Sequence, residues 1–363
     1  MLVDLIAGAR PNFMKISPII DAVIAAKNDG KDIDFRLIHT GQHYDKNMSD
    51  SFFEQLGIPQ PDVNLGAGGG TQAEQTAAIM VGYEKLLLES RKPDICLVVG
   101  DVTSTMACAI TAQKLHVKVA HVEAGIRSGD WTMPEEINRL VTDSITNYFF
   151  TTSEVANTNL RNSGIGDERI FFVGNTMIDT LIKHRPRFQK PDVWDALSLE
   201  DRGYLVMTLH RPANVDQEEK LKYLIDEIVA NTEGLPLIFP VHPRTKAMLN
   251  RIGISHERLH MIEPLGYLEF NFLVERSKAV VTDSGGITEE TTVMGVPCMT
   301  LRDNTERPET ITLGTNELLG TDPQAIAPAM KKLFGGSWKR GSIPELWDGH
   351  TAKRIIEILL QKA

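Results

Sequence analysis

The sequence predicts an α/β protein built from two doubly wound domains. Short apolar runs rich in Val, Ile and Leu alternate with helical segments along all 363 residues. Near-continuous apolar runs separated by helices are typical of parallel strands that are buried on both faces. The runs fall into two series, and the chain is long enough for two ordinary domains. Charged side chains follow almost every run, which predicts two walls of one cleft at the strand ends.

The first series contains six predicted strands and the second contains five. They are LVDLIAG (2–8), DFRLIHT (34–40), DICLVVGD (94–101), VKVAHVEAG (117–125), YFFTTS (148–153) and RIFFVGN (169–175), then YLVMTLH (204–210), LPLIFPVH (235–242), RLHMIEP (258–264), KAVVTDS (278–284) and VPCMTLR (296–302). We therefore expect one domain over residues 1–175 and another over 176–349, with a Pro- and charge-rich connector near 184–200. The final helix, within 350–363, suits either domain.

Composition narrows the classes of function. The net charge of −10 argues against a nucleic-acid or anionic-membrane partner. No apolar run is long enough to span a membrane, and the chain enters a strand at once, so we expect no signal peptide. Cys96, Cys108 and Cys298 lack CxxC spacing and sit among apolar residues, as expected of reduced thiols in a cytoplasmic protein. HTGQH (39–43) and HERLH (256–260) have the HxxxH and HExxH spacings, but each overlaps a predicted strand, at 34–40 and 258–264, and so does not place its two histidines on one helix face; we expect no metal.

Basic and acidic groups follow the strands of the first domain. GARPNFMK (8–15) lacks the glycine pattern and the Lys-Ser/Thr pair of a P-loop. It still places Arg10 and Lys15 at the first strand–helix junction, where they either bind phosphate or are simply solvated. Asp101 and Glu123 follow later strands.

The stretch HVEAGIRSGDWTMPEEINR (121–139) carries further charges just after a strand. Pro134 is suited to open a helix, on which Glu135 and Arg139 lie four residues apart on one face. These two side chains form either an exposed ion pair or, with Asp101 and Glu123, part of an acid–base site. The glycine run GAGGG (66–70) has no preceding strand and no third spaced glycine, so we interpret it as a loop and not as a dinucleotide site.

The second domain offers groups suited to an anion. In DSGGITEE (283–290), Gly285 and Gly286 begin a helix whose free N–H groups would bind an anion, unless Ser284 simply caps it. Glu290 either accepts from ribose hydroxyls or only complements the helix dipole. His210 follows a strand directly and is either a phosphate contact or a structural hydrogen-bonding group.

Taken together, these motifs resemble those of the non-hydrolysing UDP-N-acetylglucosamine 2-epimerases. They occur in family order over residues 8–320 and comprise GARPxxxK, TGQH, VxGDxxST, HVEAGxRSxD, MPEEINR, GNTxIDxL, HRxxN, PVHPRT, DSGGxxEE and RDxTERPE. The resemblance implies a GT-B fold of two Rossmann-like domains, a homodimer, a UDP-sugar bound in the interdomain cleft, and a C-terminal helix packed on the first domain.

The resemblance also implies roles for single residues. Asp101, Glu123 and Glu135 match the catalytic carboxylates, and His210 and Arg139 match residues near the reacting sugar and the phosphates. The remaining matches hold UDP or line the cleft: Arg10, Lys15, Ser284, Gly285, Gly286, Glu290 and Arg307.

This set of groups suits inversion at C2 of a UDP-acetamido sugar. The C2 hydrogen is not next to a carbonyl, and no GxGxxG is present to bind NAD for a transient oxidation, so we expect no cofactor. Elimination of UDP to a glycal, followed by re-addition, needs an acid, a base and cations on the diphosphate. Other interpretations are a hydrolysing epimerase, a GT-B glycosyltransferase, an epimerase of a UDP-diacetamido-uronate, and a non-enzymatic UDP-sugar sensor.

Overall fold

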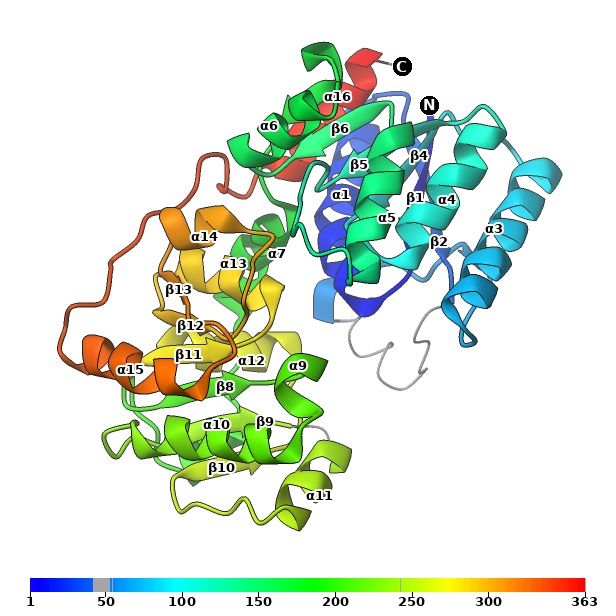
Figure 1. Ribbon diagram of the computed structural model, residues 1–363. Coiled ribbons are helices and arrows are strands. Elements are labelled where there is room, and N and C mark those ends of the chain that lie inside the picture. The colour runs from blue at the N-terminus through cyan, green and yellow to red at the C-terminus, as the bar shows by residue number, and fades with distance from the viewer. Residues whose placement is uncertain (42–52, 54, 242, 363) are drawn as a thin grey trace. The chain divides into compact units, whose positions relative to one another are not determined.

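The chain folds into two compact units (Figure 1). The computed structural model describes residues 1–41, 53, 55–241 and 243–362. Unit 1 comprises Met1–Lys183 and Glu345–Ala363, and unit 2 comprises His184–Pro344. Each unit has one parallel sheet flanked by helices, so the predicted class of two doubly wound α/β domains is confirmed.

Unit 1 is built on a seven-stranded parallel sheet in the order β3-β2-β1-β4-β5-β6-β7. The strands are β1 (Leu2–Ala7), β2 (Asp34–His39), β3 (Val63–Asn64), β4 (Ile95–Val99), β5 (Lys118–Val122), β6 (Tyr148–Thr151) and β7 (Ile170–Phe172). The helices include α1 (Arg10–Asn28), α3 (Gln72–Glu89), α4 (Thr103–Lys114), α5 (Pro134–Ile145), α6 (Glu154–Asn162), α7 (Thr176–His184) and α16 (Thr351–Lys362). The central strands β1 and β4 are buried throughout, as their apolar sequences predict.

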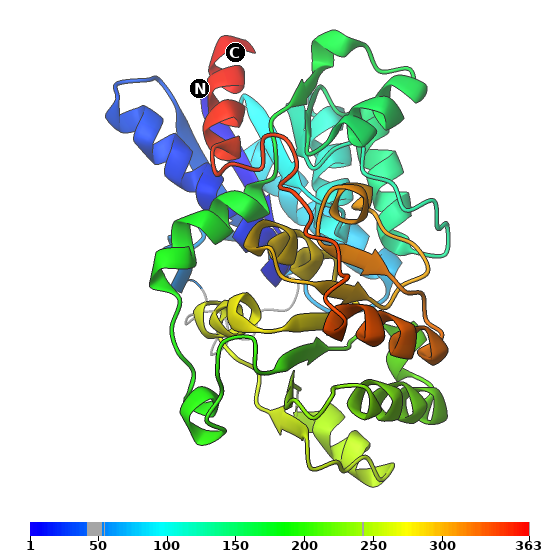
Figure 2. The same cartoon turned by 90° about the vertical axis from the view of Figure 1, so that its left-hand side faces the viewer.

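The C-terminal helix α16 belongs to unit 1, where it packs against α1 (Figure 2). Asp179 on α7 accepts the backbone N–H groups of Thr351 and Ala352 at 3.1 and 2.7 Å, which caps the start of α16. Thr180 donates to the carbonyl of Met14 at 2.5 Å. These bonds hold α7 in unit 1, so residues 176–183 lie in that unit, whereas the sequence predicts a second domain that begins at residue 176.

Unit 2 is built on a six-stranded parallel sheet in the order β10-β9-β8-β11-β12-β13. The strands are β8 (Leu205–Thr208), β9 (Leu237–Pro240), β10 (Leu259–Ile262), β11 (Ala279–Thr282), β12 (Cys298–Thr300) and β13 (Asn316–Leu318). The helices include α8 (Asp192–Ala196), α9 (Pro212–Val215), α10 (Glu218–Ala230), α11 (Pro243–Arg251), α12 (Tyr267–Arg276), α13 (Gly285–Met294), α14 (Pro308–Thr312) and α15 (Ile326–Phe334). A cluster of buried aliphatic residues from β8, β9, α10 and α15 forms the core.

The strand orders place a topological switch point in each sheet. It lies between β1 and β4 in unit 1 and between β8 and β11 in unit 2. Open parallel sheets bind ligands beyond the carboxyl ends of the strands at such points. The two switch points are therefore where functional side chains are expected. No described helix is long and apolar enough to cross a lipid bilayer.

Candidate functional site

Asn12 fixes the backbone at the switch point of unit 1. Its Oδ1 accepts the N–H groups of Gly8 and Ala9 at 3.3 and 2.9 Å, and its Nδ2 donates to the carbonyl of Val99 at 3.1 Å. The side chain thus ties the start of α1 to the end of β4. Arg10 is the first residue of α1, and its side chain lies outside the described part of the structure.

Glu123 lies at the end of β5 with its side chain buried. Its backbone φ is +71°, in the left-handed region that costs a non-glycine residue roughly 1–3 kcal/mol. Lys15 Nζ is 2.8 Å from Glu123 Oε2, and both side chains are largely shielded from solvent. Lys15, expected at a phosphate, therefore contacts a carboxylate in this structure. The pair holds Glu123 in one orientation at the strand end.

Arg139 on α5 binds two carboxylates of unit 1. Its Nη2 and Nε lie 2.6 and 3.1 Å from Asp101 Oδ2, and its Nη1 lies 2.7 Å from Glu136 Oε2. Burial acts to raise the pKa of Glu136, but hydrogen bonds from Ser128, Gly129 and Arg139 outweigh it and lower that pKa. Arg139 is thus fixed, and it fixes Asp101.

Glu135, by contrast, makes no hydrogen bond or ion pair among the residues that the structure describes. The exposed Glu135–Arg139 pair, one of the two interpretations of their spacing, is therefore wrong. Arg139 is buried against Asp101 and Glu136, as its exposed fraction of 4% shows. Glu135 is half-buried and lines a pocket instead.

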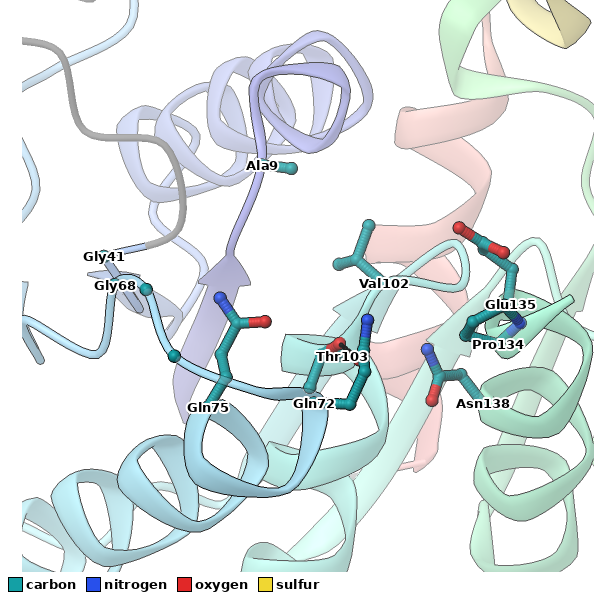
Figure 3. Close-up of a pocket in the computed structure, with 12 residues that line it drawn as sticks. Ala9, Gly41, Gly68, Gln72, Gln75, Val102, Thr103, Pro134, Glu135 and Asn138 are labelled. Atoms are coloured by element: carbon teal, nitrogen blue, oxygen red, sulfur yellow. Dashed lines mark hydrogen bonds between the residues drawn. The ribbon is translucent and has the colours of Figure 1, made fainter. Parts of the chain in front are cut away.

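That pocket has a volume of about 650 Å³ and lies entirely in unit 1 (Figure 3). Glu135 and Asn138 on α5 lie on one side of it, and Gly41 and Gly68 lie on the other. The complete lining is Ala9, Gly41, Gly68, Gly69, Gly70, Gln72, Gln75, Val102, Thr103, Pro134, Glu135 and Asn138. The GAGGG run is thus a loop, as predicted, and it forms a wall of this pocket.

Asp283 organises the switch point of unit 2. It is fully buried and accepts the backbone N–H groups of His210 and Arg211, the latter at 2.9 Å, and the side-chain amide of Asn214 at 3.1 Å. His210 Nδ1 lies 2.7 Å from Asp283 Oδ1, while the His210 side chain is 61% exposed. Burial acts to raise the pKa of Asp283, but these partners, His210 first, outweigh it and lower that pKa. Asp283 therefore orients the His210 ring so that Nδ1 faces Asp283 and Nε2 faces away from it.

Ser284, Gly285 and Gly286 form the start of α13, next to Asp283. Ser284 occupies the N-cap position of α13 with an extended backbone, but its side chain makes no capping hydrogen bond. Its N–H donates instead to Thr282 Oγ1 at 3.0 Å. The first N–H groups of a helix have no partner within the helix, and its N-terminus carries partial positive charge. This geometry suits an anion.

Glu290 lies further along α13 and is buried, with an exposed fraction of 4%. The hydroxyl of Tyr267 donates to Glu290 Oε1 at 2.8 Å, and Asn271 Nδ2 lies 3.5 Å from the same atom. Burial, reinforced by the neighbouring Glu289, raises the pKa of Glu290 to about 7 despite these bonds. Arg307 forms an ion pair with Glu289. Glu290 and Arg307, both predicted at the UDP site, therefore contact different partners, Tyr267 and Glu289 respectively, around the same helix α13.

Some residues of these sites were not predicted from sequence. They are Asn12, Asn138, Gln72, Gln75 and Thr103 in unit 1 and Asp283 and Asn214 in unit 2. Asp283 has the clearest signal, because it directly follows a buried strand at the start of the DSGG motif.

Comparisons with known proteins agree with one another. A sequence model of the family described as UDP-N-acetylglucosamine 2-epimerase matches residues 25–360. The UDP-N-acetylglucosamine 2-epimerase of Methanocaldococcus jannaschii is 41% identical over 372 residues, which cover 99% of each chain. The UDP-2,3-diacetamido-2,3-dideoxy-D-glucuronate 2-epimerase of Pseudomonas aeruginosa is 40% identical over 335 residues, which cover 91% of each chain.

Solved structures show the same likeness. The M. jannaschii enzyme in complex with UDP-GlcNAc and UDP has a TM-score of 0.86 and covers 99% of this chain and 100% of its own. UDP-GlcNAc 2-epimerase from Neisseria meningitidis, bound to UDP-GlcNAc, has a TM-score of 0.88 at 28% identity, covering 99% and 100%. The two doubly wound units thus match the GT-B fold that the motifs imply.

Proposed function

Because the chain belongs to the UDP-N-acetylglucosamine 2-epimerase family, we propose that it interconverts UDP-N-acetylglucosamine and UDP-N-acetylmannosamine by inverting C2. A base removes the C2 proton while the bond from C1 to the diphosphate oxygen breaks. The electron pair of that bond leaves with UDP, and a C1=C2 double bond remains. UDP then adds back to C1 as an acid delivers a proton to the other face of C2. The cluster of unit 1 carboxylates supports this route most strongly.

Asp101, Glu123 and Glu135 are proposed as the proton-transfer groups. Asp101 and Glu123 follow the adjacent strands β4 and β5, and each is held by a cation, Arg139 and Lys15 respectively. Glu135 has no such partner in the described structure and lines a pocket. Carboxylates in different surroundings can hold and release protons at different points of one reaction.

Binding of UDP is assigned mainly to unit 2. The N-terminus of α13, from Ser284 to Gly286, would receive the diphosphate, with His210 and Arg307 as further contacts and Glu290 at the ribose. Arg10, Lys15 and Arg139 are proposed to contact the phosphates and sugar from unit 1. These assignments rest on residue matches to the family and, for the residues whose side chains the structure describes, on the geometry of each group.

The reaction itself can be tested directly. The purified protein is incubated with UDP-N-acetylglucosamine and no added cofactor, and the products are resolved by NMR. We expect UDP-N-acetylmannosamine at equilibrium with the starting sugar. Because a P. aeruginosa relative acts on a diacetamido-uronate, that UDP-sugar is offered in parallel. Turnover of the uronate alone would replace the proposed substrate, and release of free N-acetylmannosamine would indicate a hydrolysing enzyme.

Replacing His210 by alanine is expected to weaken UDP binding. Loss of a charge-assisted phosphate contact costs roughly 1.5–3 kcal/mol, which is about tenfold or more in Kd. Calorimetry with UDP measures the change. His256→Ala is the control, because His256 contacts Asp226 on α10 in the same unit. Equal UDP affinity in the His210 variant and the wild type would remove His210 from the binding site.

A homodimer is proposed from the family and from one face of α3. Val81 and Leu88 lie seven residues apart on this helix, with exposed fractions of 66% and 69%. Two large aliphatic side chains on one exposed helix face suit contact with a second copy of the chain. Val81→Glu is expected to shift the mass measured by light scattering from dimer to monomer. Ile343→Glu, at an exposed site of unit 2, should not. A monomeric wild type would contradict this proposal.

A cytoplasmic location is proposed from the cysteines. All three thiols are free and fully buried. Burial raises the pKa of Cys298 to about 12, so this thiol is unreactive. Fractionation of cells that produce the protein tests the location, and recovery outside the cytoplasm would contradict it.

A further inference from the structure

His121 is a buried histidine beneath the carboxylates of unit 1. It lies in β5, two residues before Glu123, and its side chain is fully buried. Its Nδ1 lies 2.8 Å from Asp143 Oδ1 on α5, and its Nε2 lies 2.8 Å from the carbonyl oxygen of Gly100. Both ring nitrogens are therefore at hydrogen-bond distance from an oxygen.

The chemistry of these two oxygens determines the protonation of the ring. A carbonyl oxygen and an ionised carboxylate only accept hydrogen bonds. A neutral imidazole has one N–H, so it would place a lone pair against one of the two acceptors. An imidazolium donates to both. Burial disfavours a lone charge, but the carboxylate of Asp143 compensates it at contact distance.

Asp143 is equipped to remain ionised. Its Oδ2 accepts the N–H of Gly125 at 3.1 Å and Nη1 of Arg127 at 2.6 Å, in addition to the His121 contact at Oδ1. Burial acts to raise the pKa of Asp143, but His121 and then Arg127 outweigh it and lower that pKa. Asp143, His121 and Arg127 thus form one charge network, in which Asp143 and His121 are buried and Arg127 is partly exposed.

This network joins the two loops that carry proposed catalytic groups. Gly100, bonded to His121, directly precedes Asp101. Gly125, bonded to Asp143, follows Glu123 by two residues. Gly125 also has a φ of +79°, and a Cβ there would lie 2.4 Å from the carbonyl oxygen of Ala156, so the loop passes too close to α6 for a side chain. The path of each loop is therefore defined by backbone contacts that end in His121 and Asp143.

We propose that His121, held as an imidazolium by Asp143, is a positioning residue that sets the separation between Asp101 and Glu123. It touches neither carboxylate and acts through the carbonyl of Gly100 and, through Asp143, the N–H of Gly125. The catalytic part of this inference rests on the proposed function, because it assumes that these carboxylates transfer protons. The protonation of His121 does not depend on the proposed function, because it is argued from the two acceptors of the ring.

The first test observes the ring. Protein labelled with ¹⁵N-histidine is studied by NMR, and the His121 signals are assigned from their loss in His121→Gln. We expect both ring nitrogens of His121 to carry a proton in the wild type, as their two acceptors require. One protonated and one bare nitrogen would overturn the proposal, whatever reaction the enzyme catalyses.

The second test measures kinetics and UDP affinity in graded variants. His121→Gln keeps one donor and His121→Leu keeps none, so kcat should fall in that order. A displacement of about 1 Å in catalytic groups can cost about 10²-fold, so a loss of roughly 10- to 100-fold is expected. The Kd for UDP should stay at the wild-type value, because the proposed UDP contacts of unit 2 are not altered.

Asp143→Asn should reproduce this loss, and Asp179→Asn is its matched control. Asp179 is also a buried unit 1 aspartate that accepts two backbone N–H groups, but it caps α16 and has no link to the carboxylate loops. The control should lower Tm with kcat unchanged. Variants of His121 and Asp143 that fold and retain wild-type kcat would show that the network only stabilises the fold. An inactive wild type would refute the proposed function and leave the NMR result to decide the protonation.

Discussion

Replacing Glu135 by glutamine is expected to lower kcat by roughly 10²-fold or more, the usual contribution of a general acid or base. The substitution is nearly isosteric, and Glu135 makes no hydrogen bond or ion pair within the described residues. The fold, the Tm and the Kd for UDP should therefore stay close to those of the wild type. This makes Glu135 the cleanest of the three carboxylates to test.

Asp101→Asn and Glu123→Gln should lower kcat by a similar factor, but unlike Glu135→Gln they also break an ion pair. Glu123→Gln leaves the shielded Lys15 without its carboxylate partner, and Asp101→Asn removes one of the two carboxylates that the buried Arg139 contacts. These two variants should also lose stability, whereas Glu135→Gln should not. Glu168→Gln, at an exposed site of unit 1, serves as the control for the substitution itself. Normal turnover by all three variants would show that the proton-transfer groups lie elsewhere.

Glu290→Gln is expected to stabilise the ligand-free protein at pH 8 and to weaken UDP binding. With its pKa raised to about 7, Glu290 binds a proton in the folded state between about pH 4.3 and 7, where an unfolded glutamate is ionised. The folded state then holds more protons than the unfolded state, so stability falls as pH rises through this window. Ionising this buried carboxylate costs on the order of 3 kcal/mol above pH 7.

Glutamine has no such cost and can still accept the hydrogen bond of Tyr267. The free energy of unfolding of the variant, relative to that of the wild type, should thus rise from its low-pH value at about pH 4 to its full value near pH 8. Denaturant unfolding at several pH values measures it, with the exposed Glu257→Gln as control. Loss of a charge-assisted bond to ribose should weaken UDP binding by about 1.5–3 kcal/mol. If the variant and the wild type had the same free energy of unfolding at every pH, the raised pKa of Glu290 would be contradicted. If their UDP affinities were also equal, the proposed contact of Glu290 with ribose would be contradicted.

Sequence patterns predicted most of the fold because its strands are buried on both faces. Eleven apolar runs predict strands, and each corresponds to a strand of the structure. Among the strands of the described residues, β3 and β13 lie outside these runs. The first has two residues and the second reads Asn-Glu-Leu, so neither has the apolar run on which the prediction depends. The placement of α7 in unit 1 has no local signature in the sequence, because it depends on contacts with α1 and α16.

For the candidate site, the sequence predicts which charged side chains follow strands but not which partners they contact. Strand ends identified Asp101, Glu123 and His210, because parallel strands bring their carboxyl ends to one edge. Helical spacing suggested the wrong partner for Arg139, since the residue that meets Asp101 across a loop cannot be read from a period of four. The His121–Asp143 bond joins residues 22 positions apart, and His121 reads as one more strand residue in an apolar run.

The central claim is that C2 loses its hydrogen to the protein and regains one from the opposite face. Running the reaction in D₂O tests it most directly, with the C2 position of recovered UDP-N-acetylmannosamine examined by NMR and mass spectrometry. We expect deuterium at C2 in the epimerised product, because the acid that reprotonates the glycal exchanges with solvent. Epimerised product that retains the original hydrogen at C2 in full would contradict the elimination and re-addition mechanism.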